Sequence, residues 1–284
     1  DDFDIHEAPT CPKPTNFAST GTTSNSASFS WTTGGAANWQ LNYGSVGFTP
    51  GTGSFLATSA ASGSITGLSP NTTYDVYVRD SCGSGNVSDW VGPLTVSTLC
   101  GMVTAPWSDD FDGISFNATT GAIDPCYTTS ASTTYFWETG QGQTPTNNTG
   151  PSADHTTGTG KYVHTEAVSA FGGADSDAEF ITAEIDLDTL STPELTFWWH
   201  GAGGNIDKLE VDIFSGGTWT TELTVNSTNF TLQANPAAPW EEGVVDLTSY
   251  AGDTIKVRFT AYRSSTFGFN STQADWGLDD IKVD

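Results

Sequence analysis

Residues 194–200 read ELTFWWH, and along this stretch apolar and polar side chains alternate with a period of two. Such alternation is typical of a β-strand that buries one face. The adjacent residues Trp198 and Trp199 must point to opposite faces of that strand. We therefore expect one of these tryptophans in the core and the other covering a second surface.

The same alternation recurs along the chain, at residues 27–31, 39–43, 74–78, 208–213 and 254–259. Gly, Pro, Asn, Asp and Ser separate these runs, as is usual for turns between short strands. No window shows the 3.6-residue period of an amphipathic helix. The sequence predicts an all-β protein, and its 284 residues are enough for two domains.

Charge restricts the partners of this chain. Eight Lys and Arg stand against 33 Asp and Glu, which gives a net charge of −25. Such a chain repels nucleic acid and anionic lipid, and no apolar run approaches the ~20 residues of a membrane-spanning helix. We expect neither nucleic-acid binding nor membrane insertion. The acidity suits solubility in a saline medium or binding of divalent cations; we favour solubility for most of it and treat clustered aspartates separately.

The cysteines indicate the compartment. They number four, at Cys11, Cys82, Cys100 and Cys126. An even number without a C-x-x-C pair argues against a zinc cage and favours two disulfides formed in an oxidising space. We therefore expect an extracellular or cell-surface protein. Four cysteines allow three pairings, and the sequence alone does not settle which one forms.

The N-terminal part contains an ordered set of features. They are Trp31 on an early strand, GLSPNTTY at residues 67–74, SDW at 88–90 and TVST at 95–98. With these features, residues 11–100 resemble a fibronectin type III domain. The resemblance implies a two-sheet sandwich with Trp31 at its centre and with Leu68 and Tyr74 bracing a corner between the sheets. It also implies pairing of Cys11 with Cys82, and we pair Cys100 with Cys126.

A second set of motifs occupies the C-terminal part. In order, these are FDG at residues 111–113, FWE at 136–138, GPSADHTTGTGKY at 150–162, LTFWWH at 195–200 and WGLDDI at 276–281. Residues 101–284 are similar to a MAM domain, which implies a jelly-roll sandwich of the kind found in extracellular adhesion proteins. MAM domains usually carry four cysteines, whereas this part of the chain offers Cys126, with Cys100 at the boundary.

The beginning of the chain repeats its end. Residues 1–5, DDFDI, align with residues 279–283, DDIKV. We interpret residues 1–10 as the tail of a preceding repeat and a linker, which makes the chain one unit of a tandem array. A chance match is the alternative in a chain so rich in Asp.

Calcium is the cofactor that the MAM resemblance implies. A jelly roll brings its first strand, its last strand and an early glycine-rich loop to one edge, and hard cations bind carboxylate and carbonyl oxygens. The ligands we expect there are Asp110, Asp112, Asp154, Asp279 and Asp280. Alternation places Asp279 on the core side with Ile281 and Val283, where a carboxylate needs a partner. The alternative is that Asp279 and Asp280 only accept backbone N–H bonds.

The sequence also bears on two further kinds of site. Catalysis is not expected, because no G-x-S-x-G or H-E-x-x-H motif occurs, and His155 and His200 fit a framework role. Glycan binding would need exposed aromatic and polar side chains, for which the candidates are Trp137, Trp240, Arg263, Phe267, Phe269 and Trp276. Residues 263–270 would form a binding rim or a hairpin tip that packs its own phenylalanines.

These observations predict a non-catalytic, extracellular adhesion or structural repeat of a large secreted, cell-surface or fibre-forming protein, with structural calcium. The resemblance implies a bacterial, flavobacterial-type adhesin. Its partners would be neighbouring repeats, other copies of the same protein, or a surface glycan or protein ligand. The alternative is a carbohydrate-binding accessory module of a secreted polysaccharide-degrading enzyme or protease.

Overall fold

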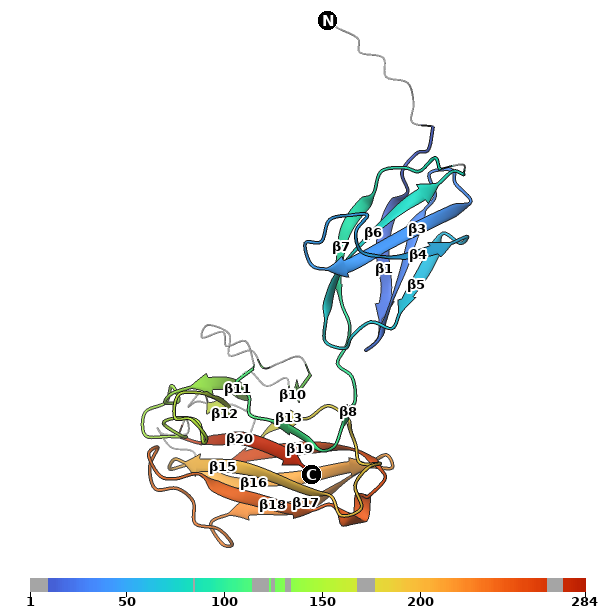
Figure 1. Cartoon of the computed structure of the whole chain (residues 1–284). Coiled ribbons are helices and arrows are strands. Elements are labelled where there is room, and N and C mark those ends of the chain that lie inside the picture. Colours follow the sequence, from blue (N-terminus) through green and yellow to red (C-terminus); the bar gives the residue numbers. More distant parts are fainter. Residues whose placement is uncertain are drawn as a thin grey trace, which may run out of the picture. The chain divides into compact units, whose positions relative to one another are not determined.

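The protein consists of two β-sandwich units (Figure 1), seen in a computed structural model that describes residues 10–83, 85–113, 123, 126–130, 134–167, 177–264 and 273–284. The units are Asp1–Gly101 and Met102–Asp284. Within the described ranges the regular structure is all β apart from one 3₁₀ turn, η1, at Thr248–Tyr250. No helix in these ranges is long and apolar enough to cross a membrane. The repeat proposed for residues 1–5 lies outside the described residues.

The first unit is a sandwich of two antiparallel sheets, in the orders β1-β2-β5 and β4-β3-β6-β7. Its strands are β1 (Thr15–Thr22), β2 (Ser26–Thr32), β3 (Asn38–Ser45), β4 (Ser54–Thr58), β5 (Ser62–Thr66), β6 (Thr73–Ser81) and β7 (Val91–Ser97). The strands predicted at residues 27–31, 39–43 and 74–78 lie within β2, β3 and β6. This arrangement confirms a fibronectin type III-like sandwich.

Side chains from both sheets form the core of the first unit. Trp31 is 6% exposed, and its ring centroid lies 6.1 Å from that of Trp39 and 6.2 Å from that of Phe17. The predicted corner is also present, because the Tyr74 hydroxyl accepts the Ser69 backbone N–H at 3.0 Å. The aromatic body of Tyr74 packs on the core while its hydroxyl satisfies a backbone donor of the turn.

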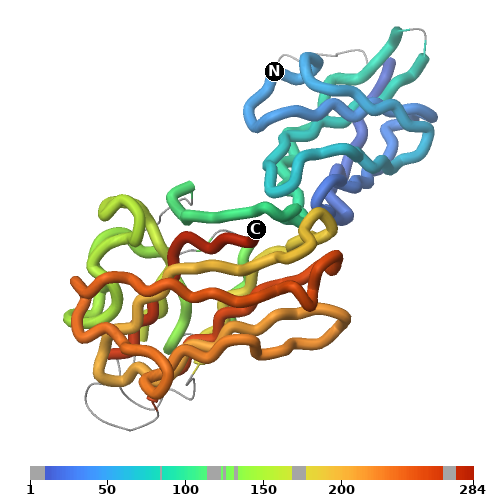
Figure 2. The backbone as a smooth tube through the Cα atoms, turned by 60° about the horizontal axis from the view of Figure 1, so that its bottom comes forward, coloured from blue at the N-terminus to red at the C-terminus, as the bar shows by residue number. Residues whose placement is uncertain are grey.

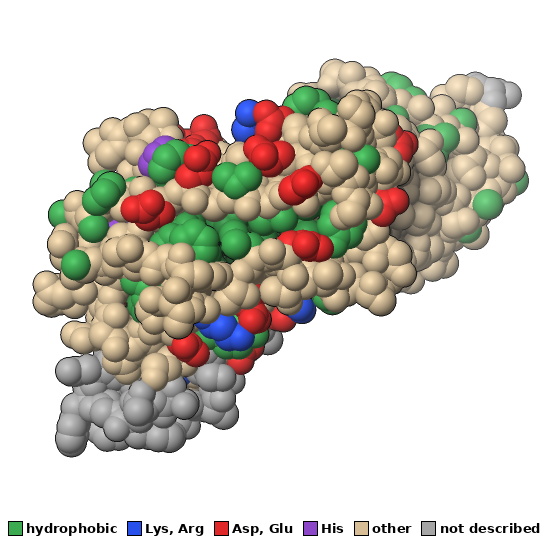
Figure 3. Space-filling view, turned by 90° about the horizontal axis from the view of Figure 1, so that it is seen from below, with side chains coloured by type: hydrophobic (Ala, Val, Ile, Leu, Met, Phe, Trp, Pro, Cys, Tyr) green, Lys and Arg blue, Asp and Glu red, His purple; other side chains and the backbone are tan. Residues whose placement is uncertain are grey.

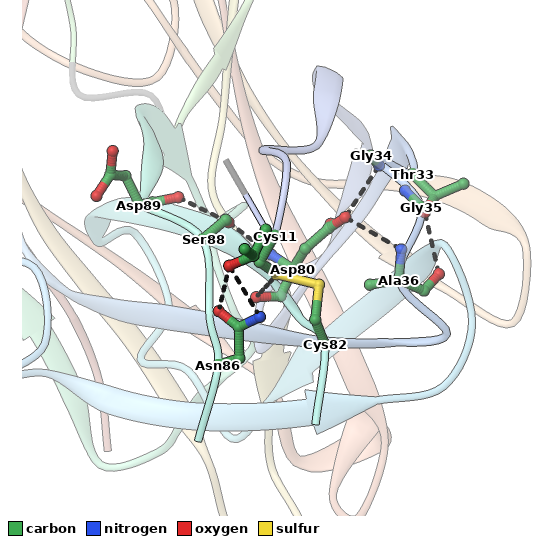
Figure 4. Close-up of a disulfide and its surroundings, with 11 residues drawn as sticks. Cys11, Thr33, Gly34, Gly35, Ala36, Asp80, Cys82, Asn86, Ser88 and Asp89 are labelled. Atoms are coloured by element: carbon green, nitrogen blue, oxygen red, sulfur yellow. Dashed lines mark hydrogen bonds between the residues drawn. A yellow bond between two sulfur atoms is a disulfide. The ribbon is translucent and has the colours of Figure 1, made fainter. Parts of the chain in front are cut away.

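A disulfide joins Cys11, just before β1, to Cys82 in the connection between β6 and β7 (Figure 4). Beside it, the Asp80 carboxylate accepts the backbone N–H groups of Gly34 and Ala36. Cys100 and Cys126 are disulfide-bonded as well, and no cysteine is free. The two predicted pairs are therefore the ones that form.

The second unit contains two larger sheets. One has the order β10-β13-β19-β14-β8, with β16 paired to β19 and β17; the other has the order β11-β12-β20-β15-β18, with β9 paired to β20. We call the second one the MAM sheet. The strands of the first are β8 (Val103–Thr104), β10 (Thr128–Thr129), β13 (Asp177–Ile181), β14 (Ile185–Asp186), β16 (Ile206–Ser215), β17 (Thr218–Asn226) and β19 (Thr254–Arg263). Those of the MAM sheet are β9 (Trp107–Asp109), β11 (Tyr135–Gln141), β12 (Lys161–Ala167), β15 (Glu194–Ala202), β18 (Glu241–Asp246) and β20 (Asp275–Val283).

Aromatic side chains fill the space between these two sheets. Phe197 and Trp199 of β15 are fully buried, and Phe197 packs edge-on against Phe259 of β19 with centroids 4.9 Å apart. Trp199 is therefore the core member of the adjacent pair, and Trp198 faces the other side of the MAM sheet, where it stacks on His155. The division of roles predicted for these two tryptophans is confirmed.

The alternation of β20 is interrupted, and one prediction is wrong for that reason. Trp276 and Leu278 point into the core, and so do Ile281 and Val283. The first pair has even residue numbers and the second pair odd ones, so the strict alternation of faces breaks between them. At this break the pairing of β20 with β15 shifts, between Thr196 and Trp198, and Asp280 has a left-handed φ of 46°. One extra residue at such a β-bulge exchanges the faces on which all later residues of the strand lie. Asp279 therefore lies on the face opposite Ile281, not on the core side.

Candidate functional site

Part of the outer face of the MAM sheet, over β11, β12 and the beginning of β20, is covered instead of exposed. Residues 142–160, which connect β11 to β12 and are yellow-green in Figure 2, fold back over this face; we call them the cover loop. Pro151 of the cover loop and Trp240 lie so close to Gly277 of β20 that a Cβ there would come within 2.9 and 2.8 Å of them. Ionisable side chains thus become enclosed on a face that strand alternation marks as polar: His164, Glu166, His200, Asp275 and Asp279.

The cover loop is organised around Asp154. Its Oδ2 accepts the Thr157 N–H at 2.7 Å, and its Oδ1 accepts the Gly160 N–H at 2.7 Å. Burial alone would raise the pKa of Asp154, but these hydrogen bonds outweigh burial and lower it. Asp112 reaches the end of the same loop, because its Oδ1 accepts the N–H of Lys161, the first residue of β12, at 2.7 Å. A Cβ on Gly160 would lie 2.3 Å from Asp112 Oδ1 and 2.9 Å from Asp154 Oδ2, so the two carboxylates can approach only over a glycine.

Asp279 and Asp280 meet the cover loop at His155. The His155 N–H donates to Asp279 Oδ2 at 2.8 Å, and His155 Nδ1 lies 2.6 Å from Asp280 Oδ2. Asp279 is 1% exposed. Burial, and then the negative charges of Asp280 and Asp154, raise its pKa to about 8. The Asp280 N–H donates to the other oxygen, Oδ1, at 2.9 Å. A buried carboxyl close to other carboxylates stays protonated or takes a cation.

Four of the five aspartates predicted as calcium ligands therefore gather at the cover loop. Asp112 and Asp154 meet at Gly160, and Asp279 and Asp280 meet at His155. Asp110 is exposed, and its Oδ1 accepts the Asp112 N–H at 3.1 Å. Many of their oxygens accept backbone N–H groups, as in the alternative interpretation of these residues.

An open groove lies beside this cluster, with a volume of about 520 Å³. Trp198 and strands β9, β15, β18 and β20 line it, and six of its ten lining residues are acidic: Asp109, Asp110, Glu194, Glu242, Asp280 and Asp284. Lys282 is the basic residue among them. Figure 3 shows acidic side chains spread over one face of the protein with few Lys or Arg between them. The groove therefore attracts cations and repels anionic ligands.

The residues predicted for glycan binding do not form one surface. Trp137 is 3% exposed, and its Nε1 donates to the Ala178 carbonyl at 2.9 Å inside the core. Arg263 is 7% exposed and lies over the Tyr135 ring. Trp276 is fully buried. These three side chains offer no face to a sugar, because aromatic and long apolar surface fills the sandwich first.

Trp240 is the one described member of the predicted glycan-binding set that stays half-buried. Its Nε1 donates to the Ala153 carbonyl at 3.1 Å, and its ring packs edge-on against Tyr162 and His200. It covers the outer face of the MAM sheet together with the cover loop. Phe267 and Phe269 lie outside the described residues.

Sequence reasoning missed the titratable residues of β11, β12 and β20. Glu138, His164, Glu166 and Asp275 alternate with apolar residues, as solvent-facing positions do. Nothing in the strand pattern shows that a loop covers them. The KYVHTEA stretch at residues 161–167 could have indicated such a site, because it places two ionisable side chains on the polar face of a strand directly after the cover loop.

Two β-sandwich units, with an open acidic groove on the second, are consistent with an adhesion or binding module. A model of the MAM domain family (meprin/A5/mu) matches residues 115–284. The chain is 28% identical over 170 residues to neuropilin-1a of Danio rerio and 28% identical over 145 residues to thyroid hormone-induced protein B of Xenopus laevis. These matches cover 57% and 51% of this chain but 17% and 19% of the two relatives, so the chain spans less than a fifth of their length.

Among solved structures, the chain is similar to the K1 cleaved adhesin domain of Lys-gingipain from Porphyromonas gingivalis W83, with 17% identity, a TM-score of 0.41, and coverage of 63% of this chain and 96% of that one. It is also similar to a carbohydrate-binding module of the β-sandwich superfamily, with 12% identity, a TM-score of 0.36, and coverage of 98% and 99%. The family match covers more than half of the sequence. The chain belongs to the MAM domain family.

Proposed function

We propose that this chain is a non-catalytic, extracellular adhesion unit that binds structural calcium where the cover loop meets β20. Its parent would be a secreted, cell-surface or fibre-forming protein in which such units repeat. Family membership supports the adhesive role, and the two disulfides and the acidic surface support an extracellular location.

The observation that carries this proposal is the burial of Asp279 beside two other carboxylates. Asp279 is 1% exposed, and the charges of Asp280 and Asp154 both raise its pKa. A divalent cation would relieve this repulsion by binding the second lone pairs of these carboxylate oxygens, since each oxygen of Asp154 and Asp279 already accepts an N–H group. Bound there, calcium would join β20 to the cover loop and stiffen the wall of the acidic groove.

Thermal unfolding with calcium and with excess chelator tests this role. Because an ion that binds only the native state stabilises it, calcium at a hundredfold excess over its Kd should add about 2.7 kcal/mol. That corresponds to a rise in Tm of roughly 5–10 °C for a domain of this size. Asp279→Asn should abolish the rise, and Asp207→Asn, at an exposed position, should keep it. Equal midpoints in calcium and chelator, with no calcium found by elemental analysis, would refute the calcium site.

Carbohydrate binding is the second candidate, and the groove beside Trp198 favours it. Its volume of about 520 Å³ suits a short oligosaccharide, and Trp198 provides an aromatic surface at its wall. Saturable binding to one neutral polysaccharide that is lost in Trp198→Ala would support this role. Self-association of the intact chain with no glycan binding would support the adhesive repeat.

A further inference from the structure

A second cluster of donor atoms lies on the outer face of the MAM sheet, separate from the aspartates of the cover loop. Glu138 of β11 stands directly opposite His164 of β12, and Glu166 lies on the same face two residues later. One donor atom from each side chain lies within 4.8 Å of the others. All three belong to one β-hairpin, so their backbone positions are fixed by strand pairing.

The hydrogen bonding of His164 leaves one ring nitrogen as an acceptor. His164 Nδ1 lies 3.1 Å from the Thr165 carbonyl oxygen, which can only accept, so Nδ1 carries the proton. The lone pair on Nε2 therefore faces Glu138 Oε1 at 3.5 Å. Two acceptors that face each other in a buried place need a proton or a cation between them. A histidine whose far nitrogen donates to a backbone carbonyl is also the usual arrangement of a metal ligand.

Glu166 offers the third donor. Thr146 of the cover loop donates to its Oε1 at 2.8 Å, whereas its Oε2 is buried and has no hydrogen-bond partner among the described residues. Glu166 is 7% exposed, so water does not readily satisfy that oxygen. One oxygen of this carboxylate is thus held in place while the other remains available.

The hairpin also leaves room for the imidazole. Gly140 of β11 lies beneath the His164 ring, and a Cβ at that position would come within 2.6 Å of Cδ2 and 3.0 Å of Nε2. Any larger residue would displace the nitrogen that faces Glu138. His164 is 2% exposed, and the Glu138 side chain is 17% exposed, which gives an ion a route from solvent.

We propose that Glu138, His164 and Glu166 bind a single Zn²⁺ ion. Ligand atoms about 2.0–2.1 Å from a tetrahedral zinc lie roughly 3.4 Å apart, which agrees with the 3.5 Å between His164 Nε2 and Glu138 Oε1. The third donor atom, a carboxylate oxygen of Glu166, lies within 4.8 Å of the other two. Calcium does not fit, because hard cations prefer oxygen ligands and one donor here is an imidazole.

The protonation states of His164 and Glu138 are compatible with the binding geometry, and burial raises the pKa of Glu166 as well. Burial lowers the pKa of His164 to about 4, so the ring is neutral at physiological pH. Burial, and then the charge of Glu166, raise the pKa of Glu138 to about 7. Zinc would take the place of the proton that Glu138 otherwise retains, and would tie β11, β12 and the cover loop together through Thr146.

Zinc titration of the whole metal-free chain, without an affinity tag, tests the proposal. Calorimetry and elemental analysis should give one zinc per chain, and Co²⁺ in its place should give the visible absorption of a four-coordinate site. Loss of a residue that only supports a metal ligand costs 10–100-fold in affinity. Glu138 and His164 would be ligands themselves, so Glu138→Gln and His164→Gln should each weaken zinc binding by about a hundredfold or more. Millimolar calcium should leave zinc binding unchanged.

The matched control is His155→Gln, which removes the histidine of the Asp279–Asp280 cluster and should bind zinc as the original chain does. Glu138→Gln changes a partly exposed carboxyl and keeps the test valid if His164→Gln does not fold. No stoichiometric zinc, equal competition by calcium, or loss of binding in His155→Gln but not in Glu138→Gln would overturn the proposal. None of these results depends on the calcium site.

Discussion

Replacement of Gly243 by alanine tests how closely the MAM sheet is packed. Gly243 of β18 pairs with Phe197 of β15, and a Cβ added there would lie 2.2 Å from Phe197 Cζ and 2.6 Å from Cε1. Carbon atoms pack at about 3.5–4.0 Å, so the ring would have to move by more than an ångström. Phe197 is fully buried against Phe259, which leaves it little room.

The expected cost of this substitution is about 2 kcal/mol. Overpacking of a core costs up to about 3 kcal/mol, and we expect the upper end here because the Phe197 ring has little room to move; replacing glycine within a strand returns about 0.5–1 kcal/mol. For a domain of this size the Tm should fall by roughly 4–8 °C, measured by calorimetry in the presence of chelator. Val244→Ala, at the next and 47% exposed position, is the matched control and should change stability by less than about 0.5 kcal/mol.

A double-mutant cycle with Phe197→Leu separates the clash from a general effect on the strand. The smaller side chain leaves space for the new methyl group, so Gly243→Ala should cost little in that background. An equal cost in both backgrounds would refute the reasoning, because the penalty would then not come from contact with the Phe197 ring.

Two further predictions concern charge and covalent linkage. Burial, and then the charge of Glu166, raise the pKa of Asp275 to about 8, far above the value near 3.9 in an unfolded chain. The folded protein therefore holds the Asp275 proton more tightly than the unfolded chain does. The stability that this proton contributes is complete at low pH and is lost as the pH rises through 8. Between pH 6 and pH 8 in chelator, Asp275 should therefore contribute about 2 kcal/mol to the fall in the free energy of unfolding, alongside the contributions of Asp279 and Glu138. Asp275→Asn should make the fall smaller by that amount, whereas the exposed Asp207→Asn should leave it unchanged; the same fall in Asp275→Asn as in the original chain would contradict this. The Cys11–Cys82 bond spans 71 residues, so replacing both cysteines by serine should destabilise the first unit by roughly 4 kcal/mol. Hydrogen exchange should then quicken in β2 and β3 but not in β15 and β16, and equal quickening in both units would argue against a local effect.

Much of the architecture is determined by short-range patterns. The strands around Trp31 and Trp199 were predictable because apolar and polar residues alternate there and turn residues delimit them. The corner at Tyr74 was predictable because its motif specifies both a turn and the side chain that braces it. In each case neighbouring residues carry the physical cause.

The orientation of Asp279 was not predictable in the same way. One extra residue at the bulge exchanges the two faces of β20, and an acidic residue in a left-handed conformation leaves no distinct mark in the sequence. Likewise, Trp137 and Arg263 looked like surface ligands because their burial depends on packing between sheets that are distant in sequence. Strand pairing and packing between the sheets determine whether these side chains are buried, and the residue types alone do not.

The candidate metal ligands depend on a still more distant relation. Glu138, His164 and Glu166 alternate as exposed residues do, and only the return of the cover loop through Thr146 encloses them. Enclosure raises the free energy of the ionised forms of these three side chains and so favours binding of a cation between them. The residues were visible in the sequence, whereas the enclosure was not.

The cover loop encloses ionisable side chains of the sheet beneath it, so it is a poor place to graft a peptide. Surface loops usually accept inserted peptides. Residues 142–160, however, form a third layer over the second unit, and an insertion there would expose the buried polar side chains beneath them to water. The two-residue turn at Gly216 and Gly217, which joins β16 to β17, makes no such contacts, and both glycines have positive φ. An epitope, a fluorophore or a whole fused domain is therefore best displayed at this turn, where the scaffold would carry it without being disturbed.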